Sequence, residues 1–295
     1  MTRNYLILDV FTREPLKGNA LAVVLDADGL GDEAMQVIAR EFNLSETIFL
    51  LKPEAEANAA SARIFTPAGE LPFAGHPTVG AAVVLGLRDD LAALRIEEKI
   101  GLVTATFEKT DRRSGEARFD LPQLPAESGS PPDPLAAAKA LGIDAGDIGC
   151  GRYRPAVYSA GNLFHLVPVR NAAVLRALAP DPAAWREAFP DGRHAVYIFT
   201  ETPDEADNDF AARMLKPGMG FEEDPGTGSA AAALMGLLSL HAPLDGQVEY
   251  RLRQGFEMGR PCHIAIRFSK ENGALVHGAI GGHAVIIASG ELDFG

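Results

Sequence analysis

The chain has 295 residues and a formal net charge of −13, with 47% hydrophobic and 23% charged residues. These values are typical of a globular protein with one large or two ordinary domains. The acidic balance disfavours nucleic acid and anionic membranes as partners, because phosphate groups are bound by clustered Lys and Arg.

The first part of the chain alternates short apolar runs with turn signals. Its opening residues, MTRNYLILDVFT, are too briefly apolar for a signal peptide, and no segment approaches the ~20 apolar residues of a membrane span. Helical spacing predicts a helix over 32–42, and the almost wholly apolar run 76–87 predicts a helix buried on all sides. Strands are expected at 5–10, 20–25, 47–51, 62–65, 102–107 and 117–121.

The second part follows a proline-rich segment and repeats the same order. Five prolines in 122–134 predict a linker. Gly161-Asn162 then matches Gly18-Asn19, ahead of another strand. The further elements expected are strands at 163–167 and 195–199, a short helix at 182–189, and a strand-rich tail from residue 248.

One segment occurs twice without a gap, at 62–87 and again at 212–237. The two copies read ARIFTPAGELPFAGHPTVGAAVVLGL and ARMLKPGMGFEEDPGTGSAAAALMGL. Each passes from an apolar strand through a glycine-rich turn into an alanine-rich helix. The repeat predicts an α+β fold of two pseudo-symmetric halves, each a mixed, mostly antiparallel sheet wrapped around a central helix. We place the halves at 1–128 and 129–295, with the last strand a candidate to return to the first half.

The turns before the two repeated helices are candidate anion sites. They read Gly75-His76-Pro77-Thr78 and Asp224-Pro225-Gly226-Thr227-Gly228-Ser229. Backbone N–H groups at a helix start lack partners within the helix and can bind a carboxylate, and glycine lets a ligand approach closely. Each turn alone could equally be a simple helix cap. Two such turns at equivalent places favour a shared cleft for a small anionic substrate.

Motifs spread over the whole chain resemble those of the PhzF (phenazine biosynthesis) isomerase family. They are Asp9-Val10-Phe11, Gly18-Asn19, Asn43-Leu44-Ser45-Glu46-Thr47, Phe65-Thr66-Pro67, the two turns, Gln254-Gly255 and Gly259-Arg260-Pro261. The resemblance implies a diaminopimelate epimerase-like fold with the active site between the halves. It also implies a homodimer and isomerisation of a dihydro-hydroxyanthranilic acid without a cofactor. The family's frequent Gly-Asn-Pro reads Gly18-Asn19-Ala20 here, which we expect to affect a turn and not the site.

Comparison of the two copies marks where the chemistry differs from that of related racemases. Those enzymes use one thiol at each helix start, and the two slots fall at Gly75 and Pro225, neither of which can carry a proton. The two cysteines, Cys150 and Cys262, lie far from both turns in sequence and form neither a disulfide framework nor a metal set. A two-thiol racemase is therefore disfavoured.

Glu46 is the candidate general acid/base. It stands just before a strand, where the second copy has Val196 at the same offset. A carboxylate entering apolar surroundings should have a raised pKa and can shuttle a proton near neutral pH. The resemblance assigns it this role, whereas the plain alternative is a capping or surface glutamate.

The resemblance also assigns substrate contacts to both turns. His76 would assist proton movement or hold a substrate group, and Asp224 would contact an amino or hydroxyl group. Gly75, Thr227, Gly228 and Ser229 would bind the carboxylate. The alternatives are a capping or core histidine and an ordinary N-cap aspartate. The other histidines show no ligand spacing, so no metal site is expected; they are His165, His194, His241, His263, His277 and His283.

The function predicted from these features is a cofactor-independent, cytoplasmic isomerase. It would move a proton on a small carboxylic acid with amino or hydroxy substituents, cyclic acids included, with one glutamate as base and then acid. Two alternatives stay open: a binding protein or sensor for an anionic metabolite, and a lyase or hydratase that uses the same carboxylate.

Overall fold

The computed structural model describes residues 2–189, 195–216 and 222–293, which fall into two compact units. The first unit takes in the chain up to Pro122 and again from Ala279 onward, and the second spans Gln123–Gly278. The boundary thus falls a few residues before the predicted division after residue 128, at the start of the proline-rich segment. None of the described helices is long and apolar enough to cross a membrane.

The strands of the first unit form a closed ring. Pairing runs β17–β1–β2–β3–β4–β6–β7–β8 and returns to β17. The pairs β2/β3 and β4/β6 are parallel and the others antiparallel. The bounds are β1 (Thr2–Val10), β2 (Asn19–Val24), β3 (Glu46–Leu51), β4 (Ala60–Phe65), β5 (Glu70–Leu71), β6 (Ala93–Glu98), β7 (Gly101–Lys109), β8 (Ser114–Asp120) and β17 (Ala274–Asp293), which starts in the second unit.

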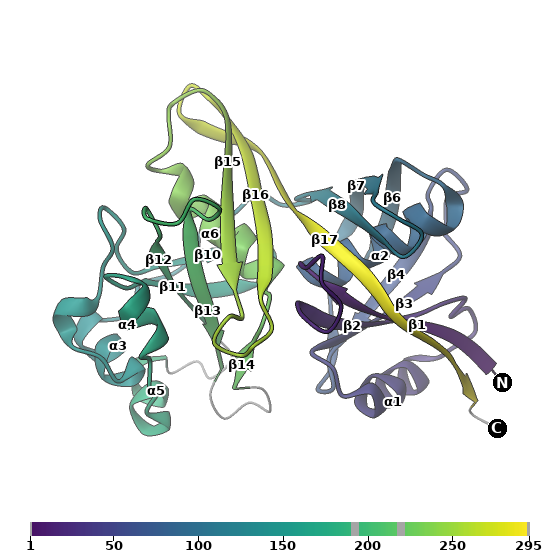
Figure 1. The fold of residues 1–295 in the computed structure, drawn as a ribbon, viewed down its shortest axis with the longest axis horizontal. Coiled ribbons are helices and arrows are strands. Elements are labelled where there is room, and N and C mark those ends of the chain that lie inside the picture. The colour runs from purple at the N-terminus through teal and green to yellow at the C-terminus, as the bar shows by residue number, and fades with distance from the viewer. Residues whose placement is uncertain (1, 190–194, 217–221, 294–295) are drawn as a thin grey trace. The chain divides into compact units, whose positions relative to one another are not determined.

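Helix α2 (Gly75–Asp89) lies among the strands of this ring (Figure 1) and is buried from Gly75 through Gly86. Two glycines let it approach the strands. A Cβ on Gly80 would lie 2.3 Å from Leu21, and one on Gly86 would lie 2.2 Å from Phe107. The all-apolar pattern of the predicted helix is explained by this enclosure, since every face of α2 meets the core.

Helix α1 (Asp32–Phe42) covers the outside of β3 and β4 and is amphipathic, as its sequence spacing predicted. Its buried face, formed by Met35, Ile38 and Ala39, packs with Phe49 and Phe65. The helix ends at Asn43, which adopts a left-handed conformation with φ 51° and donates its N–H to Ala39 O. This sharp end turns the chain directly into β3.

The second unit repeats the arrangement around α6 (Gly228–Ser239), every residue of which is buried. Strands β11/β12 and β13/β15 are parallel, like β2/β3 and β4/β6 in the first unit. The bounds are β9 (Ala126–Glu127), β10 (Ala156–Ser159), β11 (Leu163–Pro168), β12 (Val196–Glu201), β13 (Phe210–Leu215), β14 (Glu223–Asp224), β15 (Gly246–Gln254) and β16 (Cys262–Glu271). The predicted α+β class, with a sheet around a central helix in each half, is confirmed.

Three further helices give the second unit an additional core, and only one of them was predicted. They are α3 (Pro134–Leu141), α4 (Ala172–Arg176) and α5 (Pro182–Ala188), with a 3-10 turn at Ala145–Asp147. They lie together in Figure 1, and Leu141, Leu175 and Trp185 pack in one buried cluster. Helix α3 starts at the last proline of the predicted linker. Asp133 accepts a hydrogen bond from Ala136 N at 2.9 Å as its N-cap.

Candidate active site

Glu46 and His76 approach each other in the first unit. Glu46 is the first residue of β3, opposite Leu21 in the parallel β2/β3 pair. His76 is the second residue of α2. Glu46 Oε2 lies 3.5 Å from His76 Nε2, and the side chains are 18% and 4% exposed, respectively. The strand start and the helix start therefore bring together a partly accessible carboxylate and a buried imidazole.

Asn19 fixes the orientation of this imidazole. Its Nδ2 lies 3.2 Å from His76 Nδ1, and Asn19 itself is buried. An amide nitrogen only donates, so His76 Nδ1 accepts and the neutral ring carries its proton on Nε2. That proton faces Glu46. The sequence marked Gly18-Asn19 as a motif but did not show that Asn19 is the partner of His76.

A short loop after β1 holds Asn19 in place. Buried Asp9 accepts a hydrogen bond from Leu16 N at 2.6 Å and closes the loop. Gly18 adopts φ 66°, and a Cβ there would lie 2.4 Å from Val10 O. Val10 in turn pairs with Asn19 across β1 and β2. The motifs around Asp9 and Gly18 thus serve to position Asn19, and Ala20, where the family frequently has proline, is the next residue of β2.

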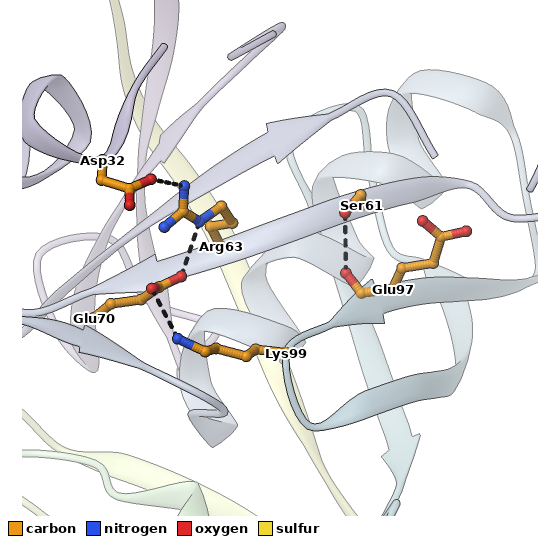
Figure 2. Close-up of polar contacts among 6 residues, drawn as sticks. All are labelled: Asp32, Ser61, Arg63, Glu70, Glu97 and Lys99. Carbon is orange, nitrogen blue, oxygen red and sulfur yellow. Dashed lines mark hydrogen bonds and ion pairs between the residues drawn. The ribbon is translucent and has the colours of Figure 1, made fainter. Parts of the chain in front are cut away.

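A network of ion pairs holds Glu70 of β5, the short strand that leads into α2. Figure 2 shows Arg63 of β4 between Asp32, at the start of α1, and Glu70 of β5. Arg63 Nη1 is 2.7 Å from Asp32 Oδ1, and Arg63 Nε is 2.8 Å from Glu70 Oε1. Lys99, after β6, adds a contact of 3.1 Å to Glu70 Oε2. The Arg63 hydrogen bond is the main cause of the lowered pKa of Glu70, which stays ionised and secures β5 ahead of Gly75.

Strand β4 also contacts β6 through Ser61 (Figure 2). Ser61 Oγ of β4 donates a hydrogen bond of 3.5 Å to the carbonyl oxygen of Glu97 in β6. The Glu97 side chain accepts from the N–H groups of Glu54 and Ala55 at 2.7 and 3.0 Å. The first contact joins β6 to β4, and the other two join β6 to the loop before β4. Together they fix the position of the next residue, Glu98.

The four predicted residues of the second turn also come together, within the second unit. Asp224 ends β14, Thr227 is the N-cap position of α6, and Gly228 and Ser229 are its first two residues. Thr227 Oγ1 donates to Asp224 Oδ2 at 2.5 Å. Thr227 makes no side-chain cap bond, and neither does Ala74 at the start of α2. Simple side-chain capping therefore does not account for either turn.

The repeat extends to the ion pair next to this turn. Arg213 is the counterpart of Arg63, and it binds Glu223 of β14 through Nε and Nη2, both at 2.8 Å. Hydrogen bonding to Glu223 is the main cause of the raised pKa of Arg213. In each half an arginine on a long strand therefore holds a glutamate on the short strand that precedes the helix start.

Gln254, at the end of β15, makes four hydrogen bonds, three of them with the second turn. Its Oε1 accepts from Tyr197 Oη at 2.9 Å and from Thr227 N at 3.1 Å. Its Nε2 donates to Asp224 O at 2.8 Å and to Thr227 Oγ1 at 3.0 Å. This is the full hydrogen-bonding capacity of an amide. The sequence marked Gln254-Gly255 as a family motif without indicating this contact.

The strand register corrects one comparison between the halves. Thr47 pairs with Phe65, and Val196 pairs with Leu215. Phe65 and Leu215 match in the repeat, so Val196 corresponds to Thr47, and the residue at the place of Glu46 is Ala195. The predicted counterpart, Val196, is therefore one residue too late. Ala195 is also buried and apolar, so the second half has no carboxylate at this place.

The described residues contain no group of three or more His, Cys, Asp or Glu side chains placed to hold a metal ion. His194 lies outside the described residues. Both cysteines are buried and neither is in a disulfide; Cys262 begins β16, and Cys150 pairs with Tyr153 in an isolated bridge. Neither belongs to the turns at Gly75 and Pro225.

Comparison with known proteins identifies the family of the chain. A family model described as phenazine biosynthesis-like protein (PhzC-PhzF) matches residues 8–290. An uncharacterized isomerase of Mesorhizobium japonicum is 43% identical over 99% of both chains. The trans-2,3-dihydro-3-hydroxyanthranilate isomerase of Pseudomonas aeruginosa is 38% identical over 89% of both. A Bacillus anthracis phenazine biosynthesis protein of the PhzF family has a similar structure, with a TM-score of 0.87 at 25% identity over 100% of both chains. The chain therefore belongs to the phenazine biosynthesis-like family and is an isomerase of the PhzF type.

Proposed function

We propose that this chain isomerises a small ring carboxylic acid by moving one proton, with Glu46 as the only proton carrier and without a cofactor. The proposed substrate class is trans-2,3-dihydro-3-hydroxyanthranilate and related amino- or hydroxy-substituted acids, after the relative from Pseudomonas aeruginosa. The observation that carries the proposal is the approach of Glu46 to the buried, oriented imidazole of His76.

The chemistry needs one group that first accepts and then donates a proton. The Glu46 carboxylate takes a proton from an activated carbon of the substrate, and the electron pair of the broken C–H bond moves into the conjugated system. The protonated Glu46 then returns the proton to another carbon. Substrate and product have the same formula, so no oxidant, reductant or leaving group is involved.

His76 and Asn19 support the base in this proposal. With its proton on Nε2, the neutral His76 presents an N–H 3.5 Å from Glu46 Oε2, and the positive end of this N–H dipole favours the ionised form of the carboxyl. Asn19 prevents the ring from presenting its other tautomer. In the proposed cycle Glu46 begins as a carboxylate, which is the state that can abstract a proton.

The two helix starts supply the proposed substrate contacts. The N–H groups at the start of α2 and α6 favour an anion, through both hydrogen bonding and the helix dipole. We assign carboxylate binding to these groups at Gly75 in the first unit and at Gly228 and Ser229 in the second. The Thr227 hydroxyl gives its single proton to Asp224, so Thr227 orients that carboxylate instead. Asp224, 7% exposed and bonded to Thr227, would accept from a substrate amino or hydroxyl group.

The test is proton exchange in D₂O followed by NMR, with trans-2,3-dihydro-3-hydroxyanthranilate as the first substrate. The expected result is conversion with deuterium incorporated at the carbon that receives the proton. Glu46→Gln keeps the shape of the side chain but cannot carry a proton, so both conversion and exchange should fall by about 10³-fold or more. Glu41→Gln, an exposed glutamate of α1, is the matched control and should retain activity.

The outcomes separate the alternatives. Binding of the acid with neither exchange nor conversion would favour a binding protein or sensor. Exchange accompanied by loss of water or ammonia would favour a lyase. Full turnover by Glu46→Gln would refute the proposed role of Glu46.

A further inference from the structure

Glu98 and Gln254 occupy equivalent positions in the two halves. In the parallel pair β4/β6, Ser61 lies opposite Glu97, and in β13/β15, Ala211 lies opposite Arg253. Ser61 and Ala211 each stand one residue before the repeated segment, so the next residues on β6 and β15, Glu98 and Gln254, occupy matching positions. Glu98 is the last residue of β6 and Gln254 the last of β15.

Both side chains reach a threonine at the start of their central helix. Gln254 bonds Thr227, at the N-cap position of α6. Glu98 Oε1 lies 2.7 Å from the hydroxyl of Thr78, in the first turn of α2. The glutamate is 7% exposed and the glutamine 1%. Each half therefore uses the same strand position to hold its helix start, with an amide in one half and a carboxyl group of the same shape in the other.

The turns that follow these residues also touch the segments before the helices. Ile100 N donates to Pro72 O at 3.0 Å in the first unit. In the second unit, a Cβ on Gly255 would lie 2.5 Å from Pro225 O. The two contacts differ in kind, but in both halves the turn that follows β6 or β15 packs against the segment that precedes the central helix.

The protons around Thr78 indicate the state of Glu98. The Thr78 hydroxyl lies 2.8 Å from Ala74 O as well as 2.7 Å from Glu98 Oε1. A hydroxyl has one proton and can donate to only one of these acceptors. If Glu98 carries a proton, it donates to Thr78, and Thr78 donates to Ala74 O. An ionised Glu98 would leave two acceptors competing for one proton.

The other carboxyl oxygen points to the same state. Glu98 Oε2 is buried and has no hydrogen-bond partner among the described residues. A bare carboxylate oxygen in the core is costly, whereas the carbonyl oxygen of a neutral acid costs much less.

We propose that Glu98 is held protonated and acts as a neutral positioning residue, which fixes Thr78 and the start of α2 as Gln254 fixes the start of α6. Glu98 thereby positions Gly75 and His76 without touching the substrate. This inference rests on the proposed function for its kinetic consequences but not for the protonation itself. Burial supports it, since burial raises the pKa of Glu98 to about 8 despite the opposing hydrogen bond from Thr78.

The charged or titratable groups next to Glu98 in sequence, on the neighbouring strand at Arg63 and at the start of α2 have partners of their own, and the β7 residue opposite Glu98 is Gly101. These groups are Glu97 with the N–H groups of Glu54 and Ala55, Lys99 with Glu70, Arg63 with Asp32 and Glu70, and His76 with Asn19 and Glu46. Loss of the Glu98 proton at alkaline pH would thus place an uncompensated negative charge beside the first turn of α2, where the substrate carboxylate is proposed to bind.

The test compares Glu98→Gln with Glu98→Leu. The glutamine variant reproduces the arrangement of the other half and cannot ionise. It should keep kcat/KM within about threefold of the parent at pH 7 and remove the fall in kcat/KM that we expect for the parent near pH 8 and above. The leucine variant should lose about tenfold or more at pH 7, mainly in KM, because Thr78 and the helix start lose their anchor.

A readout without turnover keeps the inference separate from the proposed function. Infrared difference spectra at pH 7 should show the carbonyl band of a protonated carboxylic acid in the parent, and this band should be missing in Glu98→Gln. Absence of such a band in the parent would overturn the protonated state even if the isomerase is active. Equal losses in Glu98→Gln and Glu98→Leu, or an unchanged alkaline limb in Glu98→Gln, would overturn the positioning role.

Discussion

Glu46 Oε2 lies 3.5 Å from His76 Nε2, although the two residues come from different elements and are separated by β4 and β5 in sequence. The distance depends on the end of α1, which sends the chain into β3, and on the enclosure of α2. A change that shifts either element by a fraction of an ångström would therefore affect the pair. The first prediction concerns the residue that holds the imidazole from its other side.

Replacement of Asn19 by Ala should lower kcat/KM by about 10- to 100-fold. The ring of His76 would lose the donor at Nδ1, so its neutral form could carry the proton on either nitrogen. Steady-state kinetics measure the loss, and the ¹⁵N chemical shifts of the His76 ring report the tautomer. Asn58→Ala is the control, because Asn58 only supports Glu97 in a loop. An unchanged ring spectrum in Asn19→Ala would contradict the assigned hydrogen bond.

Replacement of Gly18 by Ala should lower the free energy of unfolding by about 2–4 kcal/mol. The residue has φ 66°, and the new methyl group would press on Val10 O and on Thr12 Cγ2 at 2.5 Å. Gly29→Ala separates the two causes, because Gly29 has φ 82° but no atom within 4 Å of its Cβ position. It should cost only about 1 kcal/mol. Urea unfolding followed by circular dichroism measures both, and equal costs would show that the predicted clash is absent.

Replacement of Arg213 by Met should cost about 2–4 kcal/mol, because it leaves Glu223 as an unpaired, largely buried carboxylate. The two side chains are 11% and 14% exposed, and Arg213 also donates to Leu175 O at 3.2 Å. Lys139→Met is the control, since the Lys139–Glu187 pair is exposed and should contribute less than about 0.5 kcal/mol.

The measurement uses Trp185, the single tryptophan of the chain, which reports unfolding of the second unit by fluorescence. The double variant Arg213→Met with Glu223→Leu should recover part of the loss, because the unpaired charge is removed as well. If the double variant were less stable than Arg213→Met alone, the loss could not be attributed to that charge.

Stability should depend on pH through Glu98. Its folded pKa of about 8 lies above the ordinary value of 4.5, so between these values the folded state binds more protons than the unfolded state. Stability from this group is therefore present at low pH and lost as pH rises towards 8, by up to about 1.4 kcal/mol per pH unit. Glu70, whose pKa is lowered, titrates below this window with the opposite sign. Urea unfolding measured from pH 5 to 8 should show the free energy of unfolding falling with pH in the parent, and this slope should be missing in Glu98→Gln. The same slope in both proteins would contradict the prediction.

The repeat, the α+β class and the buried helix α2 follow from local patterns, and the structure bears them out. The apolar run before Asp89 has no polar face, so it could only be a helix enclosed by strands. The sequence of helix α3 carries helix-end residues that the surrounding prolines obscured. Asp133 before Pro134 is typical of a helix start, and Gly142, which adopts φ 67° in the structure, is typical of a helix end. Proline at the first position of a helix is favourable, not disruptive.

The partnerships within the site depend on long-range register and could not be derived from local pattern. Asn19 meets His76 only because β1 and β2 pair with Val10 opposite Asn19. The match of Glu98 with Gln254 requires the parallel pairing of β4/β6 and β13/β15. The one-residue error at Val196 has the same origin, because an ungapped sequence offset does not follow the strand pairing.

The closed ring of the first unit has a consequence for synthesis on the ribosome. Its last member, β17, pairs with β1 on one side and β8 on the other, and Asp293 lies opposite Thr2. While the nascent chain is still short of residue 279, both neighbouring strands have open edges that can pair with other chains. Strands β1 and β8 therefore wait for a partner that is synthesised only after the second unit, and a truncation that removes β17 should favour aggregation.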